Sequence, residues 1–198
     1  MLLYKQSGYS IVEFFKKHGI MDSINRQQEE ENYKDLSGTE AGRKIKDLAS
    51  KNNTCFFCTG IVTGKPVTTR PMSAQKIDEE GNFWFLSASD SHKNQDIQMD
   101  PTVQLLFQGS AHSDFLSLYG TATISTDKEL IKELWEPILK TWFTGGVDDP
   151  RITVIKFDTK DGYYWDNKHG NAVALVKMAA GAIMGKTLDD SIEGKLNV

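Results

Sequence analysis

An arginine directly before a proline, inside a short strand-like run, is the first feature of the sequence that suggests chemistry. The run Thr68–Ser73 reads Thr-Thr-Arg-Pro-Met-Ser and places Arg70 next to Pro71. Because proline cannot donate a hydrogen bond to a neighbouring strand, the run is predicted to lie at a sheet edge or to open locally. Arg70 is then either a solvated edge residue or a ligand for an anion, since its guanidinium suits phosphate and carboxylate groups.

A second candidate lies between a predicted strand and a predicted helix. Residues 87–93 read Ser-Ala-Ser-Asp-Ser-His-Lys, so hydroxyls and a lysine gather where a helix is predicted to begin at Ser91. The free N–H groups of a helix start bind anions, although the same pattern also fits an ordinary N-cap. Together, Arg70 and Lys93 predict a clamp on one phosphate through charge-assisted hydrogen bonds.

The other reactive residue types indicate no site. Cys55 and Cys58 are three positions apart in a predicted strand, so their thiols should point to opposite faces and belong to the core. The histidines at positions 18, 92, 112 and 169 lack metal-ligand spacing, and we expect no metal site. The sequence has neither a G-x-S-x-G elbow, nor a G-x-G-x-x-G fingerprint, nor a complete P-loop.

Short strands are predicted to position these residues. A capping box between Ser37 and Glu40 should open a helix that ends at Asn52. A second helix is expected over 91–98, and the helical period of 127–142 should be kinked or split by Pro137. Strands are expected over 54–62, 67–77, 82–88, 102–108, 115–125, 151–158 and 162–166, the last two around a turn at Asp161-Gly162. Because few crossover helices separate them, the fold class is predicted to be mainly β (α+β), a six- to seven-stranded antiparallel barrel or sandwich with peripheral helices.

Composition limits the classes of function. The chain has 198 residues with 23 Lys and Arg against 27 Asp and Glu, a formal net charge of −4, which argues against a general nucleic-acid binder. No apolar run approaches the roughly 20 residues of a membrane span. Two cysteines do not build a disulfide scaffold. We therefore expect a cytoplasmic protein with no nucleic-acid and no membrane partner.

One domain with short terminal extensions is the expected organisation. The polar run 26–35 has almost nothing to bury, so residues 1–36 are predicted to form a flexible N-terminal extension. Residues 37–190 are predicted to form the domain, and residues 191–198 a C-terminal tail.

Further short motifs follow Thr69-Arg70-Pro71-Met72 along residues 40–190. They are Gly81-Asn-Phe-Trp-Phe-Leu-Ser87, Ser91-His-Lys93, Asp100-Pro101, Tyr119-Gly120, Leu134-Trp135, Asp149-Pro150 and Tyr164-Trp165-Asp166. In order and spacing they resemble the pyridoxamine 5'-phosphate oxidase-like FMN-binding split barrels, and within that family the general stress protein branch. The resemblance implies a split β-barrel that forms a homodimer with FMN, a small-molecule ligand, at the subunit interface.

The resemblance also implies roles for individual residues. Arg70 matches the arginine that binds the FMN phosphate, and the run from Ser91 through His92 to Lys93 matches a second phosphate-binding element. The backbone at Met72 and Ser73 would pass the flavin. The remaining cofactor-binding residues it implies are Phe85, Leu86 and Ser87, on the strand along the isoalloxazine edge, and Trp165, which resembles an aromatic that approaches the flavin from the other subunit.

Departures from the family pattern concern the substrate. The oxidases' lysine for the substrate phosphate falls near Gln75, and their Arg-x-His element is replaced by Asp-Asn-Lys-His-Gly over 166–170, so pyridoxamine phosphate oxidation is not expected. No catalytic residue is assigned. Three readings stay open: an FMN-dependent oxidoreductase of unknown substrate, a non-catalytic flavin-binding or flavin-sequestering protein, and a barrel for another cofactor such as haem, with His112 or His169 as axial ligand. FAD is as compatible as FMN, because both carry the flavin and its first phosphate.

Overall fold

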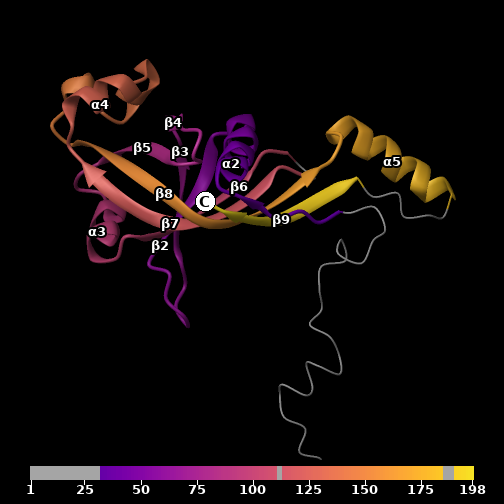
Figure 1. Ribbon diagram of the computed structural model, residues 1–198. Helices are drawn as coiled ribbons and strands as arrows, with labels where there is room; N and C mark the ends of the chain where they lie inside the picture. Colours follow the sequence, from indigo (N-terminus) through magenta and orange to yellow (C-terminus); the bar gives the residue numbers. More distant parts are fainter. Residues whose placement is uncertain (1–31, 111–112, 185–189) are drawn as a thin grey trace, which may run out of the picture.

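The structure is a computed structural model, and it describes residues 32–110, 113–184 and 190–198 (Figure 1). Strands dominate this part of the chain, and the helices lie around them. Figure 1 shows α2 against one side of the curved sheet and α4 and α5 at opposite ends of it. In chain order the elements are β1 (Leu36–Ser37), α2 (Thr39–Lys51), β2 (Thr54–Thr59), β3 (Thr68–Ser73), β4 (Lys76–Ile77), β5 (Phe83–Ala88), α3 (His92–Met99), β6 (Thr102–Gln108), β7 (Phe115–Ser125), α4 (Lys128–Leu134), the 3-10 helices η2 (Pro137–Thr141) and η3 (Gly146–Asp148), β8 (Ile152–Asn167), α5 (Asn171–Met184) and β9 (Ser191–Asn197).

The strands form one open sheet. Its order is β1-β9-β8-β7-β6-β2-β3, with β5 pairing to both β8 and β4. Every pair is antiparallel except the short parallel pair of β1 with β9. The mainly β, antiparallel split-barrel fold is therefore confirmed, but within the described residues the sheet has nine strands instead of six or seven.

The longest strand corrects the sequence prediction. We expected two strands around a turn at Asp161-Gly162, but β8 runs unbroken through both residues and pairs with β7. Gly162 does not adopt a turn conformation. A Cβ there would lie 2.7 Å from Leu118 Cδ2, so the glycine permits close packing of two strands.

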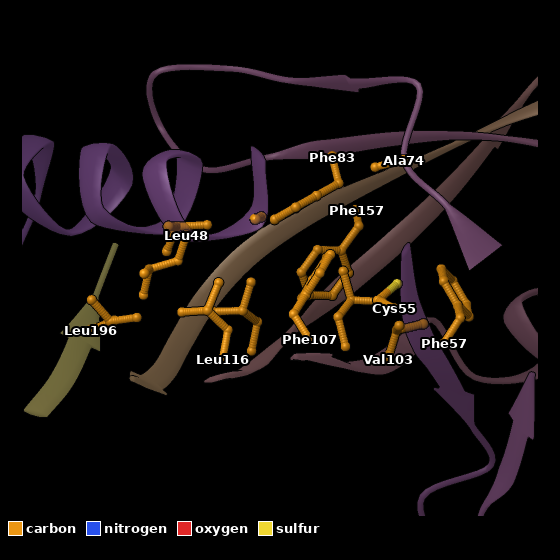
Figure 2. Close-up of a cluster of buried hydrophobic side chains, with 14 of the residues drawn as sticks. Leu48, Cys55, Phe57, Ala74, Phe83, Val103, Phe107, Leu116, Phe157 and Leu196 are labelled. Atoms are coloured by element: carbon orange, nitrogen blue, oxygen red, sulfur yellow. The ribbon is translucent and has the colours of Figure 1, made fainter. Parts of the chain in front are cut away.

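The main core lies between α2 and the sheet. Figure 2 shows Leu48 of α2, Phe83 and Phe157 in this cluster, and all three are buried. The helix was predicted correctly, but its capping box was wrong. Ser37 belongs to β1, and Gly38 at φ 54° is the N-cap without a side-chain hydrogen bond. Glycine takes this left-handed conformation without a steric penalty, which explains why it ends the strand and starts the helix.

Residues from both predicted terminal extensions take part in the sheet. The expected C-terminal tail is β9, a full strand that pairs with β8 and buries Leu196. Part of the expected N-terminal extension also belongs to the fold, because Leu36 is in the core and Tyr33 forms a bridge with Glu193. Residues 1–31 of that extension lie outside the described residues.

Smaller elements complete the domain. The predicted split at Pro137 is confirmed, since α4 ends at Leu134 and η2 begins at the proline. A second cluster of buried side chains joins this region to β5 and β8. None of the helices in the described ranges is long and apolar enough to cross a membrane.

Candidate functional site

Arg70 lies on an edge strand, as predicted, and is held from two other elements. Its strand, β3, ends the sheet order and pairs only with β2. Arg70 Nη1 donates to Thr59 Oγ1 of β2 over 2.8 Å, and Nη2 donates to Asp96 Oδ2 of α3 over 3.0 Å. Thr59 Oγ1 also donates to the same carboxylate oxygen over 2.6 Å. The guanidinium is therefore fixed in direction and keeps further N–H donors for a ligand.

The charges around Arg70 do not balance. Hydrogen bonds from Thr59 and Arg70 lower the pKa of Asp96 despite its partial burial, so this carboxylate is ionised at neutral pH. Lys93 is half-buried, and both its burial and the nearby charge of Arg70 lower its pKa. In the described part of the chain its ammonium forms no hydrogen bond or ion pair. Two cations thus lie close together while one carboxylate pairs with Arg70 alone, an arrangement that an anionic ligand would stabilise.

The start of α3 is held by a buried polar network. Ser91 is the N-cap and accepts from the backbone N–H of Asn94, as the N-cap interpretation predicted. Ser87 Oγ donates to Asn94 Oδ1 over 2.7 Å, and Asn94 Nδ2 donates to Thr153 Oγ1 over 2.9 Å. The two serine hydroxyls therefore anchor α3 to β5 and β8. Neighbouring His92 is exposed to solvent.

The predicted flavin-facing strands have free backbone edges. The side chains of Phe85 and Leu86 are buried in the two clusters, so only their backbone groups are open to a ligand. Strand β4 pairs only with the first two residues of β5, and the last link between the two segments is Gln75 N–H to Trp84 O over 2.8 Å. Beyond this link, within the described residues, the second backbone edge of 85–87 has no strand partner.

The terminal strand β3 also has a free backbone edge, because it pairs only with β2. Met72 is half-buried and Ser73 is exposed, and both lie on the strand that carries Arg70. The structure therefore places Arg70, Met72 and Ser73 on one edge strand, with Lys93 of α3 close to Arg70.

Trp165 is not part of this cluster within one chain. It lies on β8 opposite Phe115 of β7, and β7, β6 and β2 separate it from β3. Its side chain is exposed and lies beside a hollow of about 470 Å³ that is also lined by Phe115, Asp166 and Ser191. Any joint role with Arg70 requires a second copy of the chain.

The sequence reasoning missed the two residues that hold Arg70. Asp96 lies three residues after Lys93, a spacing that places both on one face of α3, and this signal was available in the sequence. Thr59 gave no signal, because its role depends on the pairing of β2 with β3.

The structure also describes the two cysteines and the residue types that could bind a metal ion. Cys55 is opposite Met72 and Phe107 on the core face, whereas Cys58 is opposite Thr69 and Gln104 on the other face, which confirms their divergence. Burial and the adjacent Cys58 raise the pKa of the Cys55 thiol. Over the ranges that the structure describes, His, Cys, Asp and Glu form no group of three that could hold a metal ion.

Of the two histidines considered as haem ligands, His169 lies within the described residues. His112 lies outside the described residues. His169 Nδ1 lies 2.7 Å from Asp190 Oδ1, and the fully buried Asp190 also accepts from Lys177 over 2.8 Å.

Comparison with known proteins identifies the same fold. The model of the pyridoxamine 5'-phosphate oxidase-like family matches residues 40–189. The protein bli-3 of Neurospora crassa is 28% identical over 156 residues, which cover 73% of this chain and 75% of bli-3. A protein assigned as general stress protein 26 from Jannaschia sp. CCS1 superposes with a TM-score of 0.66 at 24% identity, over 78% of this chain and 96% of that chain. General stress protein 26 from Bacillus anthracis gives a TM-score of 0.53 at 23% identity, over 62% and 92% of the two chains.

Proposed function

The chain belongs to the pyridoxamine 5'-phosphate oxidase-like family, and from this premise we propose that it is a general-stress-type flavoprotein that binds FMN. The observation that carries the proposal is the unbalanced charge at Arg70 and Lys93. Arg70 is fixed in direction by Asp96 and Thr59, and Lys93 remains half-buried beside it. A phosphate dianion would satisfy both cations through charge-assisted hydrogen bonds.

The neighbouring strands suit the flavin ring. The open backbone edges at Met72–Ser73 and Phe85–Ser87 would supply hydrogen-bonding groups, and the apolar surroundings would supply walls for a flat ring. Bound flavin supplies hydride and electron transfer chemistry. Hydrogen bonds from Thr59 and Arg70 keep Asp96 ionised, so Asp96 would position Arg70 for the phosphate and is not available as an acid. The proposal is therefore flavin binding without a named reaction. FAD would use the same contacts for its first phosphate.

A homodimer is the second part of the proposal. The sheet face opposite the core carries exposed Phe56, Leu106, Tyr119 and Trp165 on strands β2, β6, β7 and β8. Such an apolar face favours association between copies. A second copy would also bring its Trp165 toward the Arg70 region of the first, which one chain cannot do.

The test is flavin retention. Protein prepared without flavin is incubated with FMN, desalted and examined by visible absorption. We expect oxidised-flavin bands that remain with the protein, and a weaker signal with riboflavin, which lacks the phosphate. A protein that stays colourless with FMN, or that retains haem instead, would overturn the proposal.

A further inference from the structure

Helix α5 is apolar in sequence, and none of its described side chains belongs to either hydrophobic core. Its sequence, Asn-Ala-Val-Ala-Leu-Val-Lys-Met-Ala-Ala-Gly-Ala-Ile-Met, contains two polar side chains, Asn171 and Lys177. Figure 1 shows the helix (orange) pointing away from the end of the sheet. Leu175 and Val176 are 63% and 68% exposed, and Val173 is exposed as well. A helix that is apolar on most sides is normally buried, so its exposed surface lacks a covering partner within the described chain.

The base of α5 is nevertheless firmly attached. Lys177 Nζ donates to Asp190 Oδ1 over 2.8 Å, and the His169 backbone N–H donates to Asp190 Oδ2 over 3.1 Å. His169 Nδ1 contacts the first of these oxygens. Asp190 directly precedes β9, so these bonds fix the direction in which the helix leaves the sheet. An attached helix with an exposed apolar surface is suited to contact a partner outside its own domain.

A lipid surface matches α5 poorly. The helix has 14 residues, fewer than the roughly 20 of a membrane span. Helices that lie in the membrane interface carry several Lys or Arg on a polar face. The one basic residue of α5, Lys177, is bonded to Asp190.

A second copy of this chain offers matching chemistry. Its exposed sheet face carries Phe56 and Leu106, which lie side by side across the β2–β6 pair. The same face reaches the base of α5, because Phe115 and Trp165 line a hollow together with Ser191, the residue after Asp190. The hollow lies beside the segments that flank α5 in the sequence, so the helix and the sheet face present two apolar surfaces that two copies could bury together in a symmetric exchange.

We propose that α5 is an intersubunit arm that packs on the exposed sheet face of a second copy, whose own α5 packs on the first in return. The inference rests on the homodimer in the proposed function but does not depend on bound flavin.

Site-specific photo-cross-linking of the full-length chain tests the contact. Leu175→p-benzoylphenylalanine, irradiated without flavin, should give a covalent species of twice the 22.2 kDa chain mass, and the cross-linked peptide should come from β2 or β6. The control carries the same group at Glu129, an exposed position on α4 at the other end of the sheet, and should stay monomeric on a denaturing gel. The proposed intersubunit arm is refuted if the Leu175 probe yields no covalent dimer or reacts only within its own chain.

A comparison of glutamate substitutions gives an independent readout. Leu175→Glu with Val176→Glu should raise the dimer dissociation constant by at least about a hundred-fold, because each lost contact occurs twice in a symmetric dimer. Lys128→Glu, an exposed change on α4, should leave it unchanged. Unaltered dimerisation of the double variant, or binding of wild-type protein to phosphatidylserine vesicles through α5, would refute the inference. FMN retention is measured on the same samples: retention without the cross-link refutes only the arm, and the cross-link without retention refutes only the flavin site.

Discussion

Replacing Arg70 by alanine should weaken the binding of FMN but not of riboflavin. The structure directs the guanidinium by two hydrogen bonds, to Thr59 and Asp96, and leaves its side chain only 19% exposed. Its remaining N–H donors would therefore meet a phosphate in a partly desolvated place. Riboflavin has no phosphate, so it reports on every other contact of the flavin.

The size of the effect follows from the chemistry of the lost bond. A hydrogen bond to a charged group contributes about 1.5–3 kcal/mol. Arg70→Ala should therefore raise the FMN dissociation constant about 10- to 150-fold. The variant also leaves the Asp96 carboxylate without its cation, beside the phosphate. Adding Asp96→Asn to Arg70→Ala should recover the part of the loss that comes from this repulsion.

Fluorescence titration of flavin-free protein measures both ligands. The matched control is Arg43→Ala, which removes an exposed arginine from α2 and should bind FMN like the wild type. Equal losses for FMN and riboflavin would mean that Arg70 supports the fold and not the phosphate. An unchanged FMN affinity would refute the phosphate site itself.

Three further predictions concern stability. Burial alone would raise the pKa of Asp190, but hydrogen bonds from Lys177 and His169 lower it to about 2 from 3.8, so the carboxylate stabilises the fold above pH 3.8 and loses this contribution as the pH falls toward 2. When the free energy of unfolding is measured with denaturant across that pH range, the values for wild type and Asp190→Asn should converge at the acid end. Gly162→Ala should lower the free energy of unfolding by about 1–3 kcal/mol, because the new Cβ would meet Leu118 and the Ser117 carbonyl. A chain that begins at Ser37 should be about 2–4 kcal/mol less stable than one that begins at Asn32, since it loses the buried Leu36 and the 2.8 Å bond from Lys34 N–H to Glu193 O; equal stability would show that this segment is not part of the fold.

The sequence predicts those elements whose signals are local. The alternation of Val103, Leu105 and Phe107 predicted β6 with its buried face, and Pro137 predicted the break after α4. Gly162 was misinterpreted because glycine is favoured both in turns and where two chain segments approach each other closely. Only the contact with Leu118, on another strand, decides between them. The strand β9 was missed for a similar reason, since its partners lie in β8 and at the N-terminal end of the domain.

The same distinction holds for the candidate site. Pro71 correctly placed Arg70 on an edge strand, and Ser91 correctly marked the start of α3. The ion pair of Arg70 with Asp96 could not be derived from either segment alone, because it depends on how α3 lies against β2 and β3. The role predicted for Trp165 involves a second copy of the chain, because β7, β6 and β2 separate it from β3 within one chain. It stays a prediction that only a second copy can test.

The arrangement around Arg70 explains why a single carboxylate suits a phosphate site. Without Asp96 the guanidinium would be held by Thr59 alone, and ordering it further would cost part of the binding free energy. With a second carboxylate beside Lys93, the positive charge would be cancelled and a phosphate would gain little. Asp96 instead fixes one cation, and Lys93 keeps a surplus of positive charge whose pKa is lowered by burial and by Arg70. A bound phosphate should reverse that shift, so the ligand and the Lys93 proton should stabilise each other.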